Sequence, residues 1–356
     1  MRHHSINTIN TLACFSIIAF HFRRNLQGQI PKEDFGFYSQ LFMAIIYALF
    51  IIGVPLFLLS TGYLMNKKMP AKTYFLKVLS LYSLYLICSL SSHAILSLAG
   101  HTDLTVKEVF FQLSNFTLIG YSWYVEMYLG LALFIPYLNK LIKDISQREF
   151  SYIIAGLLLL CGAPGMVNTI PFFAGTIAFP KYWVILYPIA YYFIGAYINR
   201  FEATFKWTAA NLIIVALTYI SSTFLIFTIA IRYASPYVGG VEGGYSSLIV
   251  MAAGTALFLL MLTLIKVKIP LTAFIAKLTL PIYLMSYTID QLVYSKLSSL
   301  VSSPKKLFLL MPIIALMNFV GAIILGFITY VLNRLFWQLI DWLQKKSKLN
   351  THPSQT

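Results

Sequence analysis

The stretch Ser5–Phe22, with the sequence SINTINTLACFSIIAFHF, decides the fold of this chain. About 18 residues at a rise of 1.5 Å each are long enough to cross a bilayer as one helix. Helical spacing back from His21 reaches one face that holds Ile17, Cys14, Asn10 and Asn7. A lipid-facing helix has no reason to carry a polar stripe that ends in an imidazole. We therefore expect this face to look into the protein or a wet cavity and to form the floor of an active site.

The composition is that of a membrane protein. Hydrophobic residues make up 59% of the chain and charged residues only 10%, and the mean hydropathy is positive. A soluble globule has no means of covering so much apolar surface, so we predict an all-α, polytopic integral membrane protein. The first stretch is not a cleaved signal peptide, because His-Phe-Arg-Arg follows it rather than a small-residue cleavage site.

We expect about ten transmembrane helices, and an even number puts both termini on the same side. The predicted spans are 5–22, 38–65, 76–99, 121–142, 150–170, 182–199, 207–231, 245–265, 271–297 and 307–333. Pro55 is expected to bend the second span, Gly162 and Pro164 to break the fifth, and the polar segment 100–120 to lie at the interface.

The net charge of +15 comes from Lys and Arg dispersed in small groups between the spans. This is the distribution of topology signals, and its bias places both termini in the cytoplasm. A nucleic-acid-binding protein needs one concentrated basic face, so no nucleic-acid partner is expected; contact with membrane lipid is. We predict a single membrane-embedded domain over 1–345 and a short basic and polar cytoplasmic tail over 346–356.

Three ionisable side chains, His21, Glu126 and Asp290, are predicted to share the outer third of the membrane. An ionisable group within a span costs at least about 2.5 kcal/mol, which makes each a functional hypothesis. A neutral imidazole takes a proton from a hydroxyl acceptor, and a carboxylate fixes its tautomer, as acyl transfer to an alcohol requires. Arg23 or Arg24 would hold an oxyanion or an anionic acceptor. Alternatively, Glu126 pairs with one of these arginines as a structural group.

The ninth span adds a polar face beside Asp290, formed by Tyr283, Ser286 and Tyr287. Such a face suits a hydroxyl-rich ligand, and hydrogen bonding between helices is the alternative reading. No other histidine has metal-ligand spacing to His21, so no metal is expected. The residue pattern alone fits a transporter or an export component equally well, because its carboxylates within the membrane would look the same.

Several stretches, in this order, resemble the acyltransferase-3 family of bacterial surface-polysaccharide O-acetyltransferases. They are INTLACFSIIAFHF (Ile9–Phe22), GVPLFLLSTGYLMNKK (Gly53–Lys68), YSWYVEMYLGLALFIPYLNKL (Tyr121–Leu141), YPIAYYFIGAYI (Tyr187–Ile198) and KLTLPIYLMSYTID (Lys277–Asp290). The resemblance spans nearly the whole chain. It implies a multi-pass protein of the bacterial inner (plasma) membrane that transfers an acyl group, in most cases acetyl, from cytoplasmic acetyl-CoA to a hydroxyl of a cell-surface or lipid-linked polysaccharide.

The family's histidine falls on His21, and the arginine that precedes it by eleven positions falls on Asn10. Asn10 keeps the face and a hydrogen-bonding group but not the charge. The family's final-motif histidine falls on Ser286, and Trp123 matches a position of the fourth span.

The resemblance also implies that Lys72 and Lys77 contact the phosphates of the acyl-CoA donor. We assign His21 as the general base, with Glu126 or Asp290 as its orienting partner. The predicted substrate-binding residues are Asn10, Arg23, Arg24, Trp123, Tyr283, Ser286 and Tyr287. Direct transfer and a transient acyl-enzyme fit the sequence equally well.

Overall fold

A computed structural model describes residues 2–27, 36–169, 179–205, 207–233, 241–300 and 304–351, and all regular structure in these ranges is helical. The elements in the first half of the chain are α1 (Arg2–Gln27), α2 (Phe37–Phe50), α3 (Gly53–Met65), α4 (Lys72–Leu98), α5 (Val106–Ser114), α6 (Trp123–Ile142), α7 (Gln147–Leu157), a π-helical turn (Leu158–Gly162) and α8 (Ala163–Thr169). The second half holds α9 (Lys181–Val184), α10 (Tyr187–Phe201), a 3₁₀ turn (Glu202–Thr204), α11 (Ala209–Tyr233), α12 (Val241–Ser246), α13 (Leu248–Leu264), α14 (Pro270–Lys277), α15 (Thr279–Leu300) and α16 (Pro304–Thr351).

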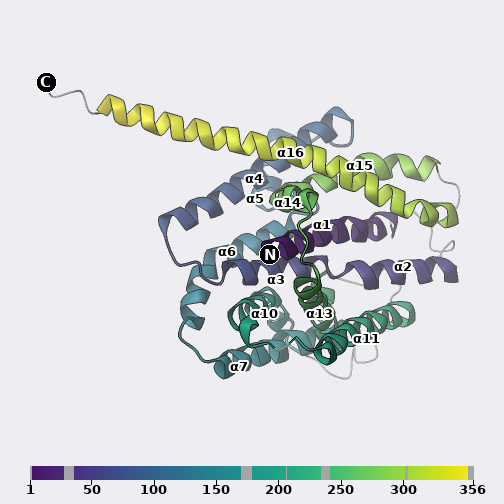
Figure 1. Cartoon of the computed structure of the whole chain (residues 1–356). Helices are drawn as coiled ribbons and strands as arrows, with labels where there is room; N and C mark the ends of the chain where they lie inside the picture. Colours follow the sequence, from purple (N-terminus) through teal and green to yellow (C-terminus); the bar gives the residue numbers. More distant parts are fainter. Residues whose placement is uncertain are drawn as a thin grey trace.

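The first helix lies at the centre of the bundle. It packs against α2 and α3 on one side and against α14, α15 and α16 on the other, while α10, α11 and α13 lie beyond α3 (Figure 1). The residues of α1 that contact these neighbours, among them Ile9, Ala13 and Cys14, are fully buried. A central position explains why this helix carries polar groups: its stripe faces protein instead of lipid.

Seven helices in the described ranges are long and apolar enough to cross a bilayer, or eight if α14 and α15, which meet at 76°, count as one bent span. A further apolar helix, α13, is shorter. The chain is therefore an all-α multi-pass membrane protein, as the composition predicted. The count of ten spans and the side on which the termini lie stay predictions.

Two of the predicted interruptions appear in the structure. The second span breaks between Phe50 and Gly53, just before Pro55, whose missing N–H leaves the carbonyl of Ile51 without a helical donor. The fifth span contains the π-helical turn Leu158–Gly162, after which α8 continues with Pro164 in its first turn. Proline and glycine thus set where these spans bend.

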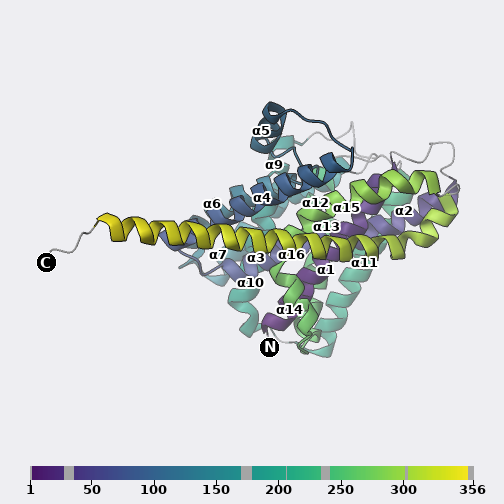
Figure 2. The same cartoon turned by 90° about the horizontal axis from the view of Figure 1, so that it is seen from above.

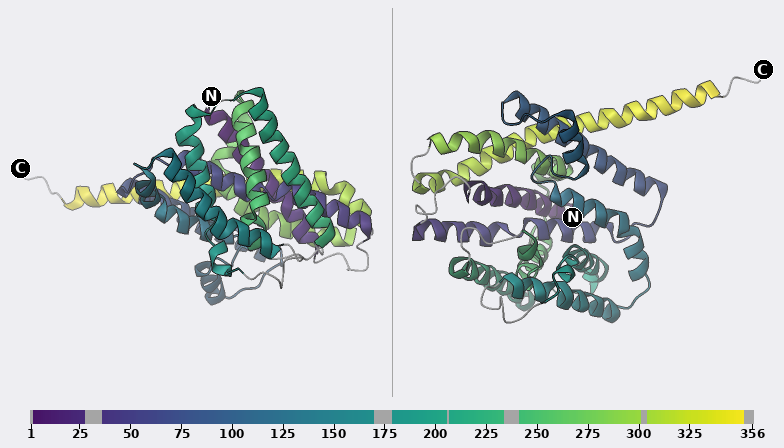
Figure 3. Two further views of the ribbon diagram at one scale, coloured as in Figure 1. Left: turned by 90° about the horizontal axis from the view of Figure 1, so that it is seen from below. Right: turned by 180° about the vertical axis from the view of Figure 1, so that it is seen from behind.

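The last helix is longer than predicted. It continues past residue 333 to Thr351 and crosses the predicted domain boundary at 345 without a break. The reason is local, since residues 334–351 contain neither glycine nor proline and are rich in good helix formers. The extra turns project beyond the rest of the bundle (Figures 1 and 2), as both views of Figure 3 also show.

The segment 100–120 is the exposed excursion that the sequence predicted. It holds α5, whose first turn is closed by a capping box between Thr105 and Glu108. Phe110 and Phe111 on this helix are exposed, which fits a helix at a membrane interface.

Helices α3 and α10 approach each other at two glycines. A Cβ on Gly62 would collide with the carbonyl oxygen of Tyr192, and a Cβ on Gly195 with the carbonyl oxygen of Leu59. Small residues at a crossing allow helix backbones to touch inside a membrane, where apolar burial gives little driving force for association. These two helices therefore form one tightly joined unit.

Candidate active site

The imidazole of His21 lies beside the carboxylate of Asp290. Both side chains are buried, and His21 Nδ1 is 4.0 Å from Asp290 Oδ2. This separation is longer than a hydrogen bond, and Nδ1 has no hydrogen-bond partner among the described residues. Catalytic hydrogen bonds often tighten only when substrate binds, so the geometry is that of an imidazole next to its orienting group.

Three donors hold the Asp290 carboxylate in place. Tyr121 donates its hydroxyl to Oδ2 at 2.6 Å and Asn25 donates its amide to the same oxygen at 3.1 Å. Asn318 donates to Oδ1 at 2.6 Å. Charge-assisted hydrogen bonds are among the strongest in proteins, and here they come from α1, the loop before α6, and α16. The carboxylate is therefore fixed from three directions.

The ring of Tyr121 is the second neighbour of the imidazole. Its centroid is 3.6 Å from that of His21, with the two planes inclined by 28°. Tyr283 donates its hydroxyl to the Tyr121 carbonyl at 2.5 Å, and the guanidinium of Arg24 lies 5.7 Å from the centroid of the Tyr121 ring. Tyr121 thus links the imidazole, the carboxylate and an arginine at the C-terminal end of α1.

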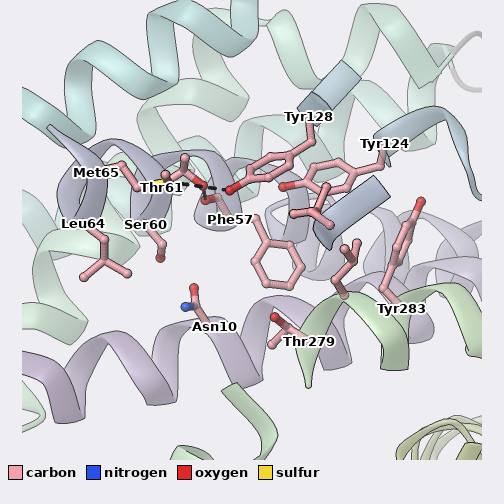
Figure 4. Close-up of a pocket in the computed structure, with 12 residues that line it drawn as sticks. Asn10, Phe57, Ser60, Thr61, Leu64, Met65, Tyr124, Tyr128, Thr279 and Tyr283 are labelled. Carbon is pink, nitrogen blue, oxygen red and sulfur yellow. Dashed lines mark hydrogen bonds between the residues drawn. The ribbon is translucent and has the colours of Figure 1, made fainter. Parts of the chain in front are cut away.

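A cavity of about 240 Å³ lies between α1, α3, α4, α6 and α15 (Figure 4). Its lining consists of Asn10, Phe57, Ser60, Thr61, Leu64, Met65, Leu81, Tyr124, Tyr128, Thr279, Leu280 and Tyr283. Asn10 on α1 and Ser60 on α3 point into it from opposite sides. Asn10 Oδ1 and Ser60 Oγ are both buried without a hydrogen-bond partner among the described residues. Unpaired buried polar atoms are costly, so two of them in one cavity point to a ligand that pairs with them.

Tyr283 connects this cavity to His21. It lines the cavity, and its ring centroid is 6.2 Å from that of the imidazole. Asn10 lies about 16 Å from His21 along α1, at a rise of 1.5 Å per residue. The cavity thus occupies the half of the bundle nearer the start of α1, and one end of it reaches the neighbourhood of the imidazole.

The predicted site residues do not all meet. Glu126 is exposed on α6, and His21 is paired with Asp290, so the geometry selects Asp290 from the two predicted carboxylates. The Ser286 hydroxyl donates to the Tyr283 carbonyl of its own helix at 2.7 Å and is not part of the cavity lining. Tyr287 contacts the Tyr121 ring edge-on, with the centroids 5.2 Å apart.

Three further predicted substrate-binding residues, Trp123, Arg23 and Arg24, each lie near a tyrosine ring. Trp123 stacks on Tyr245 of α12, with centroids 5.8 Å apart and planes inclined by 17°. Arg23 is buried and lies over Tyr47 of α2, whereas Arg24 is exposed. The two arginines are therefore in different environments.

Lys72 and Lys77 are exposed on the first turns of α4 and line neither cavity described here. A second cavity, of about 380 Å³, lies between the ends of α3, α6 and α10 and carries Lys67, Lys143 and Arg200. Arg200 donates to the carbonyls of Ile142 and Ile145, so its guanidinium is already engaged. Lys67 and Lys143 are exposed and suit a phosphate as point charges.

Within the described part of the chain, no three His, Cys, Asp or Glu side chains gather in a way that could hold a metal ion. The groups that meet at His21 are one imidazole, one carboxylate, a phenol and two amides. This set serves proton transfer and orientation.

A family model described as an acyltransferase domain, acyltransferase family 3, matches residues 3–332. The chain belongs to acyltransferase family 3. Neither the curated proteins nor the solved structures contain a significant match. The match runs from α1 into α16 and therefore covers every site residue of this acyltransferase described above.

The acyltransferase has site residues that the sequence did not single out, namely Tyr121, Asn25 and Asn318. Asn25 had a readable signal, since it follows His21 by one helical turn on the same face. Asn318 is a polar residue within the apolar run of the last span, which is a weaker signal of the same kind. Nothing in the local pattern around Tyr121 distinguishes it from the chain's other tyrosines, because its role depends on which helix packs beside it.

Proposed function

We propose that this family 3 acyltransferase moves an acyl group, acetyl in the simplest case, from cytoplasmic acetyl-CoA to a hydroxyl of a cell-surface or lipid-linked polysaccharide. In this proposal the protein lies in the bacterial inner membrane with both termini in the cytoplasm, so that α1 starts on the donor side. The observation that carries the proposal is the buried pairing of the His21 imidazole with the fixed carboxylate of Asp290. The family supplies the reaction class.

The proposed chemistry is a direct transfer. His21 takes the proton from the acceptor hydroxyl as its oxygen attacks the thioester carbonyl, and the carbon–sulfur bond then breaks. The proton passes from the imidazolium to the departing thiolate, which leaves as CoA. Asp290 orients the ring and stabilises its cationic form while the proton resides there. Arg24, which lies over Tyr121, is close enough to the outer end of the site to steady the negative charge on the reacting oxygen.

The donor arm is proposed to occupy the cavity between α1 and α3. Its walls combine apolar side chains such as Phe57 and Leu280 with the unpaired polar atoms of Asn10 and Ser60. An alkyl chain carrying amide groups, such as the arm of CoA, fits such a lining because each amide supplies a donor and an acceptor. Lys67 and Lys143 join Lys72 and Lys77 as candidates for the phosphates on the cytoplasmic face.

The test compares His21→Ala and wild type in two measurements. Acyl transfer is followed as the O-acyl content of the surface polysaccharide by NMR, and donor binding as the rise in melting temperature of the purified protein with CoA. We expect His21→Ala to abolish acylation and to keep the CoA response. A variant that still acylates its polysaccharide contradicts the assignment of His21. A wild-type protein that ignores CoA contradicts the donor and favours a transporter.

A further inference from the structure

Among the described Asp, Glu, His, Lys and Arg residues, those with a buried side chain are His21, Arg23 and Asp290. His21 and Asp290 lie next to each other, and three donors satisfy the carboxylate. Arg23 is only 6% exposed, and no described carboxylate forms an ion pair with it. Its Nε is buried without a hydrogen-bond partner in the described part of the protein. The described structure therefore contains a buried cation with no counter-charge.

The surroundings of Arg23 stabilise the cation only in part. Its guanidinium lies 4.8 Å from the centroid of the Tyr47 ring, and Tyr47 is itself held against α12, since a Cβ on Gly244 would be 2.8 Å from the Tyr47 hydroxyl. Stacking on an aromatic face offsets part of the cost of removing a guanidinium from water. It leaves Nε without an acceptor among the described residues, and the planar guanidinium matches a carboxylate or a phosphate in geometry.

The position of Arg23 relative to the imidazole is set by helix geometry. A residue two positions beyond His21 lies on nearly the opposite side of α1, whereas Arg24, three positions beyond it, shares the imidazole's side. Arg24 accordingly lies over Tyr121, and Arg23 lies over Tyr47. An anion held by Arg23 would thus lie across α1 from the imidazole, near Tyr47, and would leave His21 free for a neutral hydroxyl of the same acceptor.

We propose that Arg23 is the binding residue for an anionic group, a carboxylate or a phosphate, that the acceptor carries at the outer end of α1. The inference rests on the proposed function and restricts the class of acceptor. The acceptor is then an acidic saccharide or a saccharide joined to a lipid through phosphate. An anionic lipid headgroup has the same chemistry and is the second possible source of the charge.

The test uses the full-length protein in phosphatidylcholine nanodiscs and measures the melting temperature with glucuronate, glucose 1-phosphate and glucose as probes. Wild type is expected to be stabilised by one of the two anionic sugars but not by glucose. Arg23→Gln should weaken that response at least about tenfold in apparent Kd, because a charge-assisted contact is lost. Arg23→Lys keeps the positive charge but lacks the planar guanidinium, so its apparent Kd should lie between those of wild type and Arg23→Gln.

Arg148→Gln is the matched control, because Arg148 also lies over a tyrosine ring, that of Tyr152 at 5.6 Å, but is exposed on α7. It should respond as wild type does. Nanodiscs containing phosphatidylglycerol separate the two sources: stabilisation that depends on Arg23 and appears only with this lipid assigns the anion to a headgroup. If Arg23→Gln does not fold, Arg23→Lys carries the comparison.

The inference is overturned if wild type ignores glucuronate, glucose 1-phosphate and phosphatidylglycerol alike, which would mean that the chain itself neutralises Arg23, or if Arg23→Gln responds as strongly as wild type. The CoA response keeps this outcome separate from the proposed function. If wild type responds to CoA but not to the anions, only the inference of an acidic acceptor is contradicted. If it responds to the anions but not to CoA, only the proposal of CoA as the donor is contradicted.

Discussion

Two buried polar regions of this acyltransferase differ in how their polar atoms are satisfied. Around Asp290, both carboxylate oxygens accept hydrogen bonds, from Tyr121, Asn25 and Asn318. In the cavity between α1 and α3, Asn10 Oδ1 and Ser60 Oγ have no partner in the described part of the protein. Both regions are lined by α1 and α15, and Tyr283 belongs to both. Within the described residues, the protein thus pairs both oxygens of the Asp290 carboxylate and leaves these two cavity atoms without partners.

The difference indicates separate tasks. A carboxylate whose two oxygens are both held by donors needs little reorganisation at the moment of reaction and suits a group that must orient a proton acceptor. Unpaired atoms in a cavity destabilise the empty protein and are paired again only by a ligand. Amide and hydroxyl substitutions in the two regions should therefore change different quantities, and each of the following predictions uses that contrast.

The largest effect is expected from Asp290→Asn. The amide is nearly isosteric but carries no charge to stabilise the imidazolium, so the rate of acyl transfer should fall on the order of a hundredfold or more. The assay is turnover with saturating acetyl-CoA, and the CoA-dependent rise in melting temperature should persist. A rate within about threefold of wild type would contradict the pairing of Asp290 with His21.

Asn318→Leu should come next. It removes the donor to Asp290 Oδ1, 2.6 Å away, and leaves a buried carboxylate oxygen unpaired. The expected cost is about 2 kcal/mol of folding free energy together with a fall in kcat of about tenfold. Thermal unfolding in detergent measures the loss of stability, and a turnover assay measures the fall in kcat. An unchanged melting temperature would show that this amide is not needed to hold the carboxylate.

Asn10→Leu is the same chemical change in the other region, with a different expected outcome. Because Asn10 Oδ1 has no described partner to lose, the melting temperature should stay the same or rise. The KM for acetyl-CoA should rise by about tenfold while kcat stays near the wild-type value, since one hydrogen bond to the donor is lost. A lower kcat at an unchanged KM would place Asn10 in the chemistry instead.

Ser60→Ala should give the smallest effect, an increase of about threefold in the KM for acetyl-CoA with no loss of stability. Its control is Ser83→Ala, because the Ser83 hydroxyl donates to Asn333 at 2.8 Å and accepts from Trp337 at 2.8 Å. That control should lower the melting temperature and leave the KM unchanged. If the two serine variants changed the melting temperature and the KM to the same extent, the distinction between hydrogen-bonded and unpaired serines would not hold.

The sequence predicts those parts of the site that one helix determines by itself. The polar stripe of α1, the ionisable Asp290 and the breaks near Pro55 and Gly162 all follow from periodicity, charge within a span, or the missing N–H of proline. The family resemblance was confirmed over residues 3–332.

The rest depends on packing between helices. Glu126 and Asp290 look equivalent in the sequence, and only the rotation of each helix about its axis leaves Glu126 exposed and brings Asp290 to His21. Tyr121 reaches the carboxylate from a loop before α6, a contact between residues 169 positions apart. The length of α16 was underestimated because the end of an apolar run is not the end of a helix.

The contact of α3 with α10 at Gly62 and Gly195 bears on how the protein alternates between its two substrates. Because the two backbones are in contact, α3 and α10 cannot slide or tilt against each other without a steric clash. They therefore form a rigid wall of the cavity, and Ser60 lies on the side of α3 that faces the cavity. If the cavity changes shape when the donor binds, we expect the change in the opposite wall, where α14 and α15 meet at 76° beside Thr279.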